Sequence, residues 1–328
     1  MTFALNQNFL MTQTFADHPS TTAVATTTPR LLIVTPAKNE AEFVRDTLET
    51  VIAQTARPTR WVIVNDGSTD DTGAILDATA AEHSWIQVVH RQSGGRVVGR
   101  GVVDAVQDGL DAAAEAGYPI ETFDYFCKLD ADLRLTPNYF ADLFRQFEAD
   151  PRLGTVSGKC FNRLDDGRLV DERIGDDFSL GAAKLYRREC FEEIGGFVRG
   201  VMWDGIDCHR CRLLGWTARS VSDENLRIVH LRQMGSSHKS IWHGRCRWGR
   251  GQWFMGTHPV YLLGIAAWRT MERPWVIGGL GILWGYVRAA IRREPRYEAP
   301  GFRRHLHRWQ FRELRRRLGL GRRDSGGL

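Results

Sequence analysis

The sequence predicts an α/β fold in which helices flank a mostly parallel, Rossmann-like sheet. Residues 31–35 and 61–64 are short β-branched runs that end where polar residues begin, as buried parallel strands do. Residues 86–89 and 123–126 continue the series, and a helix is expected between them from about residue 98 to residue 115. The repeated order of strand, polar loop and helix is typical of α/β proteins.

The loops after the first two strands are the first places to look for a ligand site. Residues 36–40 read Pro-Ala-Lys-Asn-Glu and lead into an amphipathic stretch with Phe43, Leu48 and Val51 on one face. Residues 65–72 are rich in Gly, Ser and Asp, which form tight turns and cap helices. Both loops follow the carboxyl ends of strands, where open α/β sheets bind their ligands.

Two aspartates, Asp130 and Asp132, follow the apolar run that ends at Leu129. Unpaired carboxylates at the end of a buried strand are costly, and a divalent cation would offset that cost. Hard oxygen ligands suit Mg²⁺ or Mn²⁺ holding a diphosphate. A helix N-cap or a solvated loop is the alternative for an isolated pair. Asp66 ends the second strand at the same edge of the sheet, so three carboxylates are expected to line one crevice.

These elements, taken in order, resemble those of a family-2 glycosyltransferase over roughly residues 30–240. The resemblance implies the GT-A fold and inverting transfer from a nucleotide diphosphate sugar, with UDP as the expected nucleotide. It also implies that the donor is held by Pro36, Asn39, Glu40 and Asp66. The residues that carry the resemblance are 36–40, 65–72, 130–132, 195–197 and 203–216.

The same resemblance implies that Asp130 and Asp132 bind Mn²⁺ or Mg²⁺ on the donor diphosphate. Counting back from Gly215-Trp216, Asp204 falls where the family has its catalytic aspartate, while Trp203 replaces the preceding glutamate. An inverting transfer needs one carboxylate within reach of the acceptor hydroxyl. Asp207, one helical turn on, is the second candidate for the base, and a helix N-cap without chemistry is the alternative for Asp204.

Three further residues are expected near the donor. His230 follows a short strand at residues 226–229, and the resemblance implies a contact with the metal or the diphosphate. A structural role is the alternative for a single histidine at a strand end. Arg100 and Lys128 are candidates to meet the donor's negative charge, with solvated surface cations as the alternative.

The basic charge of the chain is concentrated at its C-terminus. Residues 288–328 contain thirteen arginines and four acidic residues, a net charge of +9, so the rest of the 328-residue chain carries −4 of the total +5. A positive segment on an acidic body implies an anionic partner. The arginines follow tryptophan-rich apolar segments, unlike a nucleic-acid-binding face, so we expect no nucleic-acid partner.

Two apolar segments, residues 259–268 and 275–287, precede the arginines. Each is shorter than the roughly 18–20 residues that cross a bilayer. Trp268, Trp275 and Trp284 mark segment ends as aromatic residues do at a headgroup boundary. We therefore expect helices that lie in a membrane interface; the alternative is a hairpin of helices buried against the catalytic domain or a second subunit.

The predicted organisation is a disordered tail at 1–29, a GT-A domain at 30–240, and a helical, amphipathic, basic membrane-associating segment at 241–328. The expected activity is transfer to a membrane-held, lipid-linked or glycan acceptor in glycolipid, polysaccharide or cell-envelope biosynthesis. The expected location is the cytoplasmic face of the cell membrane, peripheral or monotopic. A catalytically inactive nucleotide-sugar-binding subunit of a glycan-synthesis complex is the alternative.

Overall fold

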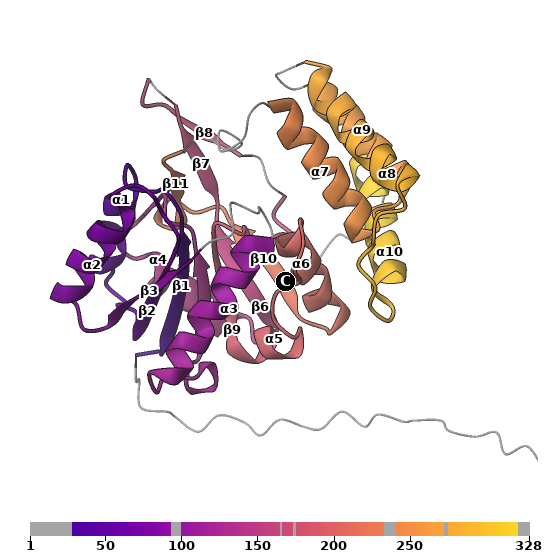
Figure 1. Ribbon diagram of the computed structural model, residues 1–328. Helices are drawn as coiled ribbons and strands as arrows, with labels where there is room; N and C mark the ends of the chain where they lie inside the picture. Colours follow the sequence, from indigo (N-terminus) through magenta and orange to yellow (C-terminus); the bar gives the residue numbers. More distant parts are fainter. Residues whose placement is uncertain are drawn as a thin grey trace, which may run out of the picture.

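The computed structural model describes residues 28–92, 100–164, 166–172, 175–232, 241–271 and 275–320. Figure 1 shows an α/β body with a separate group of helices along one side. The disordered tail predicted for residues 1–29 lies outside the described residues except at its last two positions.

The main sheet confirms the predicted α/β class. Its order among the described residues is β10-β6-β9-β4-β1-β2-β3, and only β9 runs antiparallel to its neighbours. The strands are β1 (Leu31–Ala37), β2 (Arg60–Asp66), β3 (Ile86–Arg91), β4 (Tyr125–Leu129), β6 (Leu153–Gly158), β9 (Ala183–Arg187) and β10 (Thr217–Val221).

The fourth strand lies further along the chain than the predicted 123–126. A 3₁₀ turn, η1 (Ile120–Thr122), precedes it, and the strand continues to Leu129 because residues 125–129 are all buried. Tyr125 pairs with Leu31 of β1 in parallel register. Asp130 therefore comes directly after the last strand residue, at the carboxyl edge of the sheet.

Helices cover both faces of the main sheet. Leu31 and Ile33 of β1 pack with α1, α2 and α4, whereas Leu32 and Val34 pack with α3, α5 and α6, since alternate strand residues point to opposite faces. The bounds are α1 (Val44–Ile52), α2 (Thr72–Glu82), α3 (Arg100–Glu115), α4 (Tyr139–Ala149), α5 (Arg188–Glu193) and α6 (Trp203–Leu213).

A second sheet, of order β5-β11-β7-β8, lies beside the carboxyl edge of the first. His230 is the last residue of β11, where it pairs with Leu133 and Asn162. The strand therefore begins two residues later and ends one residue later than predicted. Its strands are β5 (Leu133–Leu135), β7 (Cys160–Arg163), β8 (Leu169–Asp171) and β11 (Ile228–His230).

The C-terminal segment is helical, as predicted. Its helices are α7 (Ile241–Met255), α8 (Pro259–Thr270), α9 (Ile277–Ile291) and α10 (Phe302–Arg317). Phe302 and Leu306 of α10 pack on Ile206 of α6 and join this group to the α/β body. Among the described residues, no helix combines the length and the apolar character that crossing a membrane requires.

Candidate active site

The loops after β1 and β2 are tied together by side-chain to backbone hydrogen bonds. The Asn39 backbone has a positive φ of 55°, and its side-chain Oδ1 accepts a hydrogen bond from the Thr69 N–H at 2.8 Å. The Glu40 N–H donates to Thr72 Oγ1 at 2.8 Å. Pro36 lies within the end of β1, pairing with Val64. Asn39 therefore shapes the rim of the crevice by joining its two loops.

Asp66 ends β2 between two cationic side chains. Lys38 Nζ is 3.8 Å from its Oδ2 atom, and Arg91 Nε is 3.2 Å from its Oδ1 atom. Arg91 also reaches Asp108 of α3 at 3.1 Å. Sequence reasoning missed Arg91, although its place at the end of the third parallel strand is the same signal that identified Asp66. Arg100 begins α3, and its side chain lies outside the part that the structure describes.

Lys128 is buried beside the first metal-site aspartate and is not a solvated cation. Its side chain is 3% exposed, forms an ion pair with Asp130 Oδ1 and donates to the Gly181 carbonyl at 2.8 Å. Burial raises the pKa of Asp130, although the charge of Lys128 acts in the opposite direction. Lys128 and His230 both favour the charged carboxylate, and a metal ion would add a further positive partner.

His230 lies between two carboxylates that come from different strands. Its Nε2 atom is 3.3 Å from Asp132 Oδ1, and its Nδ1 atom is 3.4 Å from Glu172 Oε1. Cys160 Sγ is 3.8 Å from the same Nδ1 atom. Burial disfavours the charged imidazole, but hydrogen bonds to Asp132, Cys160 and Glu172 raise the pKa of His230. Sequence reasoning missed Glu172, which lies 58 positions away.

Asp132 keeps its negative charge despite its burial. Burial alone would raise the pKa of Asp132, but the hydrogen bond from His230 and the positive charges of His230 and Arg232 hold it below the usual value. Arg232 also donates to Glu40 Oε2 at 2.5 Å, and its Nε atom is 3.8 Å from Asp132 Oδ2. Glu40 is therefore buried in an ion pair with Arg232, which links the loop after β1 to Asp132.

The predicted metal ligands come together in space. Asp130, Asp132 and His230 each offer one ligand atom, and these atoms lie within 4.8 Å of one another. Two carboxylates and an imidazole form a donor set that Mn²⁺ accepts once the imidazole has lost the proton from the ligating nitrogen, and Mg²⁺ would use chiefly the carboxylates. A second group, Cys160, Glu172 and His230, shares the histidine. Glu172 thus contacts the Nδ1 atom of the candidate ligand His230, as carboxylates commonly do with the histidines of metal sites.

Gly181 lies between Asp204 and the pair formed by Lys128 and Asp130. A methyl group on Gly181 would be 3.2 Å from Asp204 Cβ, so the glycine backbone passes directly beside this side chain. The carbonyl of the same glycine accepts the hydrogen bond from Lys128. The Trp203 ring lies 5.5 Å from Lys128 Nζ. The Asp204 carboxylate is half-buried, and its Oδ1 atom accepts from the Gly205 N–H at 2.9 Å. Gly181 therefore connects Asp204 to Lys128 and its partner Asp130.

Asp207 is held in the protein interior. It is 1% exposed, its Oδ2 atom is 3.1 Å from Lys184 Nζ and it accepts a hydrogen bond from the Tyr186 hydroxyl. Lys184 also donates to the backbone carbonyl of Asp204 at 2.8 Å. Asp207 is therefore screened from solvent, and its ion pair fixes the turn that carries Asp204.

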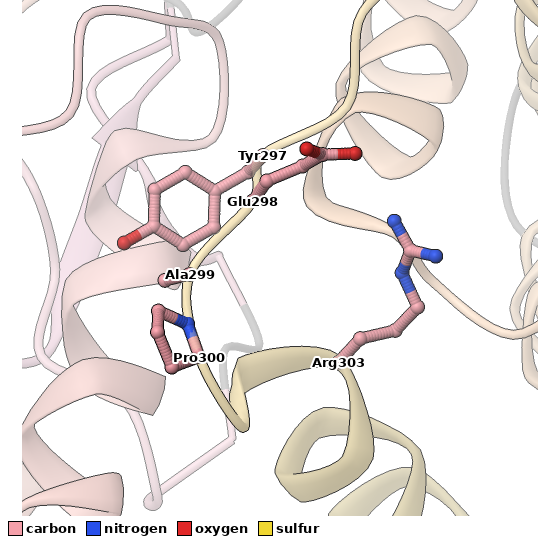
Figure 2. Close-up of a pocket in the computed structure, with 5 residues that line it drawn as sticks. All are labelled: Tyr297, Glu298, Ala299, Pro300 and Arg303. Carbon is pink, nitrogen blue, oxygen red and sulfur yellow. The ribbon is translucent and has the colours of Figure 1, made fainter.

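The predicted site residues do not line the pocket in Figure 2. That cavity, of about 320 Å³, lies where the chain enters α10. It is lined by Tyr297, Glu298, Ala299, Pro300 and Arg303. We place the candidate site at the carboxyl edge of the main sheet, where the loops and carboxylates converge.

The main sheet and the helices on both its faces define a GT-A-type fold, which a solved glycosyltransferase structure shares. Residues 32–200 match the family described as Glycosyl transferase family 2, and the chain belongs to this family.

Two curated relatives and one solved structure illustrate the similarity. Glycosyltransferase GlyG of Streptococcus pneumoniae is 25% identical over 230 residues, which are 62% of this chain and 71% of GlyG. Poly-beta-1,6-N-acetyl-D-glucosamine synthase of Staphylococcus aureus is 29% identical over 120 residues, 37% of this chain but only 26% of the synthase. Mannosyltransferase PcManGT of Pyrobaculum calidifontis, in complex with GDP-Man and Mn²⁺, has a TM-score of 0.55 at 16% identity, covering 82% of this chain and 89% of PcManGT. The last likeness shows the fold alone.

Proposed function

We propose that this protein is a metal-dependent, inverting glycosyltransferase that moves a sugar from a UDP-linked donor to a membrane-held or lipid-linked acceptor. The observation that carries the proposal is the convergence of Asp130, Asp132 and His230, with Asp204 connected to them through Gly181 and Lys128. Glycolipid, polysaccharide or cell-envelope synthesis at the cytoplasmic face of the membrane is the proposed setting.

The aspartate cluster supports the assignment of the donor diphosphate. A diphosphate brings about two negative charges into a crevice that already holds carboxylates, so a cation must lie between them. Asp130, Asp132 and His230 would hold Mn²⁺ or Mg²⁺ there, and the bound ion would neutralise the charge of the departing nucleotide. Lys128 adds a buried positive charge beside Asp130.

The two loops support the assignment of the nucleoside. Asp66 lies at the end of β2 with both carboxylate oxygens near cations, and Pro36 and Asn39 border the same edge. The name of the S. aureus relative contains N-acetyl-D-glucosamine, so UDP-N-acetylglucosamine is the first donor to test. GDP-mannose is the second, because the structurally similar PcManGT was solved with it.

Asp204 is the proposed general base. Its carboxylate would accept the proton of the acceptor hydroxyl while that oxygen attacks the anomeric carbon from the face opposite the diphosphate. The buried ion pair of Lys184 with Asp207 holds the backbone of Asp204 in place. Asp207 has no exposed surface from which to reach an acceptor, and we assign it a positioning role.

A donor screen tests this proposal. Nucleotide release from UDP-N-acetylglucosamine, other UDP-sugars and GDP-mannose is measured with Mn²⁺, with and without a membrane extract, and product configuration is read by NMR. We expect extract-stimulated release from a UDP-sugar and inversion at the anomeric carbon. Donor binding without release under any condition would instead identify an inactive nucleotide-sugar-binding subunit, and retention of configuration would contradict the in-line mechanism.

A further inference from the structure

Helix α9 presents its large apolar side chains to solvent. Ile277, Leu280, Trp284, Val287 and Ile291 follow one another at spacings of three and four residues and therefore share one face of the helix. They are 45–75% exposed. A helix of a globular protein usually buries such a stripe, and large exposed apolar patches mark interaction sites.

The opposite side of α9 is buried and rich in glycine: it carries Gly278, Gly279, Gly281 and Gly285 together with Ile282, Tyr286 and Ala289. A methyl group on Gly285 would lie 2.0 Å from the Cys246 carbonyl oxygen of α7, and one on Gly279 would lie 2.4 Å from the Ala266 carbonyl oxygen of α8. Gly281 and Gly285 are four residues apart, the spacing that allows close helix contact in membranes. The helix thus buries its glycines with Ile282 and Tyr286, and exposes the stripe of five large apolar side chains.

Helix α8 extends the same apolar surface. Val260, Leu263 and Met271 are 47–63% exposed, while Leu262 packs with Tyr286 of α9. The other side of α8 contacts α10, where the Tyr261 ring lies 6.1 Å from that of Trp309.

The two exposed stripes lie on one side of the hairpin. Thr270 of α8 meets Gly279 near the start of α9, and the Tyr286 hydroxyl further along α9 donates to the Thr257 carbonyl just before α8. The helices therefore run antiparallel, with α7 and α10 packed on their inner side, and Figure 1 shows α7 between the α/β body and α9. We call the other side the outer face. It comprises Val260, Leu263, Met271, Ile277, Leu280, Trp284, Val287 and Ile291.

We propose that the outer face docks the protein on the headgroup region of an anionic lipid bilayer. Helices α8 and α9 have 12 and 15 residues, fewer than the roughly 20 that span a bilayer, so they would lie along its surface. Exposed Arg288, Arg292 and Arg293 flank the end of the outer face. Arginines near anionic lipid contribute about 1 kcal/mol each.

The charge of the C-terminal segment favours lipid over a second copy of the chain. A single stripe at three- and four-residue spacing would suit a coiled coil, but the outer face is two helices wide. A second copy would bring another segment of net charge +9 against the first. Anionic lipid headgroups bring the opposite charge to the arginines.

Docking would extend the proposed function, since an enzyme held at the bilayer meets a lipid-linked acceptor at the surface. Only this link to the acceptor rests on the proposed function, because binding to lipid needs neither donor nor metal.

Flotation of the full-length protein with phosphatidylcholine vesicles containing phosphatidylglycerol tests the inference. The variant Leu263→Glu/Leu280→Glu places two charges on the outer face. The matched control is Leu169→Glu/Val170→Glu, two residues of β8 that are 40% and 45% exposed. We expect the wild type and the control to float, and the outer-face variant to bind at least about tenfold more weakly, because each charge replaces an apolar contact with lipid.

A second measurement uses the wild type without charged substitutions. Trp284 fluorescence should be quenched by brominated lipids, and Trp284→Phe should remove that part of the quenching. High salt should weaken flotation without abolishing it, because it screens the arginines and leaves apolar burial intact. Absence of quenching, equal flotation of all variants, or a wild-type dimer that the outer-face variant converts to a monomer would overturn the inference.

Calorimetry with Mn²⁺ and UDP separates this inference from the proposed function. All three proteins should bind the nucleotide equally, since the substituted residues lie outside the crevice. Failure of the wild type to float, with its nucleotide binding intact, would count against docking alone. Failure of the wild type to bind any nucleotide would contradict the proposed chemistry and leave the flotation result standing.

Discussion

The ammonium of Lys184 lies 3.1 Å from the Oδ2 atom of Asp207, and both side chains are fully buried between β9 and α6. The same ammonium donates to the Asp204 carbonyl. A buried ion pair of this kind is costly to break, because removing one partner leaves an uncompensated charge. The pair connects the stability of the sheet–helix junction to the position of the proposed base.

Lys184→Met should destabilise the protein by about 3–5 kcal/mol, because it leaves the Asp207 carboxylate buried without its cation. Urea unfolding measures the change. The double variant Lys184→Met/Asp207→Leu removes both charges and should recover much of the loss. If the double variant is less stable than Lys184→Met, the pair is not the source of the effect.

The ion pair also predicts a pH dependence. Burial alone would lower the pKa of Lys184, but the negative charge of Asp207 outweighs it and raises that pKa. Its stabilisation is fully present below the unfolded value of about 10.4 and is lost as pH rises through the higher folded value. The stability difference between the wild type and Lys184→Met should therefore shrink only above about pH 10.4, the unfolded pKa of lysine. A stability difference that already falls between pH 7 and pH 9 would contradict the predicted direction of this pH dependence.

Asp130→Ala or Asp132→Ala should abolish the metal-dependent part of nucleotide binding. The reason is that the diphosphate would meet the remaining carboxylates without a cation between them. Calorimetry with UDP, with and without Mn²⁺, measures the loss. Glu115→Ala, at an exposed position on α3, is the control and should bind as the wild type does. Unchanged affinity in both aspartate variants would remove the metal assignment.

Glu172→Ala should weaken Mn²⁺ binding by about 10- to 100-fold, because His230 would lose the carboxylate that orients its Nδ1 atom. Glu172→Gln keeps an oxygen acceptor and should lose less. Titration of Mn²⁺ followed by electron paramagnetic resonance gives the affinity without any donor or turnover. Equal affinities in the wild type and both variants would show that Glu172 has no positioning role.

Gly285→Ala should loosen the contact between α7 and α9, because the added methyl group would overlap the Cys246 carbonyl. Hydrogen exchange of α9 and the urea midpoint should both report the loss. Gly244→Ala, on α7 with open space around the glycine, should be neutral or stabilise by about 0.5–1 kcal/mol through helix propensity. If the two variants behave alike, the glycine contact does not hold the hairpin.

Much of the fold and part of the site could be predicted from local sequence. Strand ends and polar loops are short-range signals, so Asp66, Asp130 and Asp132 were found where the structure places them. The apolar pattern likewise indicated the helices at the C-terminus. Periodicity could not tell which side of α9 is exposed, because large apolar residues lie on both its buried and its exposed sides.

The supporting contacts of the site could not be predicted, because they join distant parts of the chain. Arg232 and Glu40 are 192 positions apart, and the antiparallel insertion of β9 between β4 and β6 brings Lys184 to α6. Neither relationship has a local signal. The burial of Asp207, which distinguishes its role from that of Asp204, likewise depends on packing that a single sequence does not reveal.

The transfer rate of Asp204→Asn, measured at saturating donor and Mn²⁺, tests the central claim most directly. Asparagine keeps the shape of the side chain and removes the proton acceptor. The rate should therefore fall by on the order of 10²–10⁴ while the affinity for the donor stays at the wild-type value. A variant that transfers sugar at the wild-type rate would contradict the assignment of Asp204 as the base of an inverting glycosyltransferase.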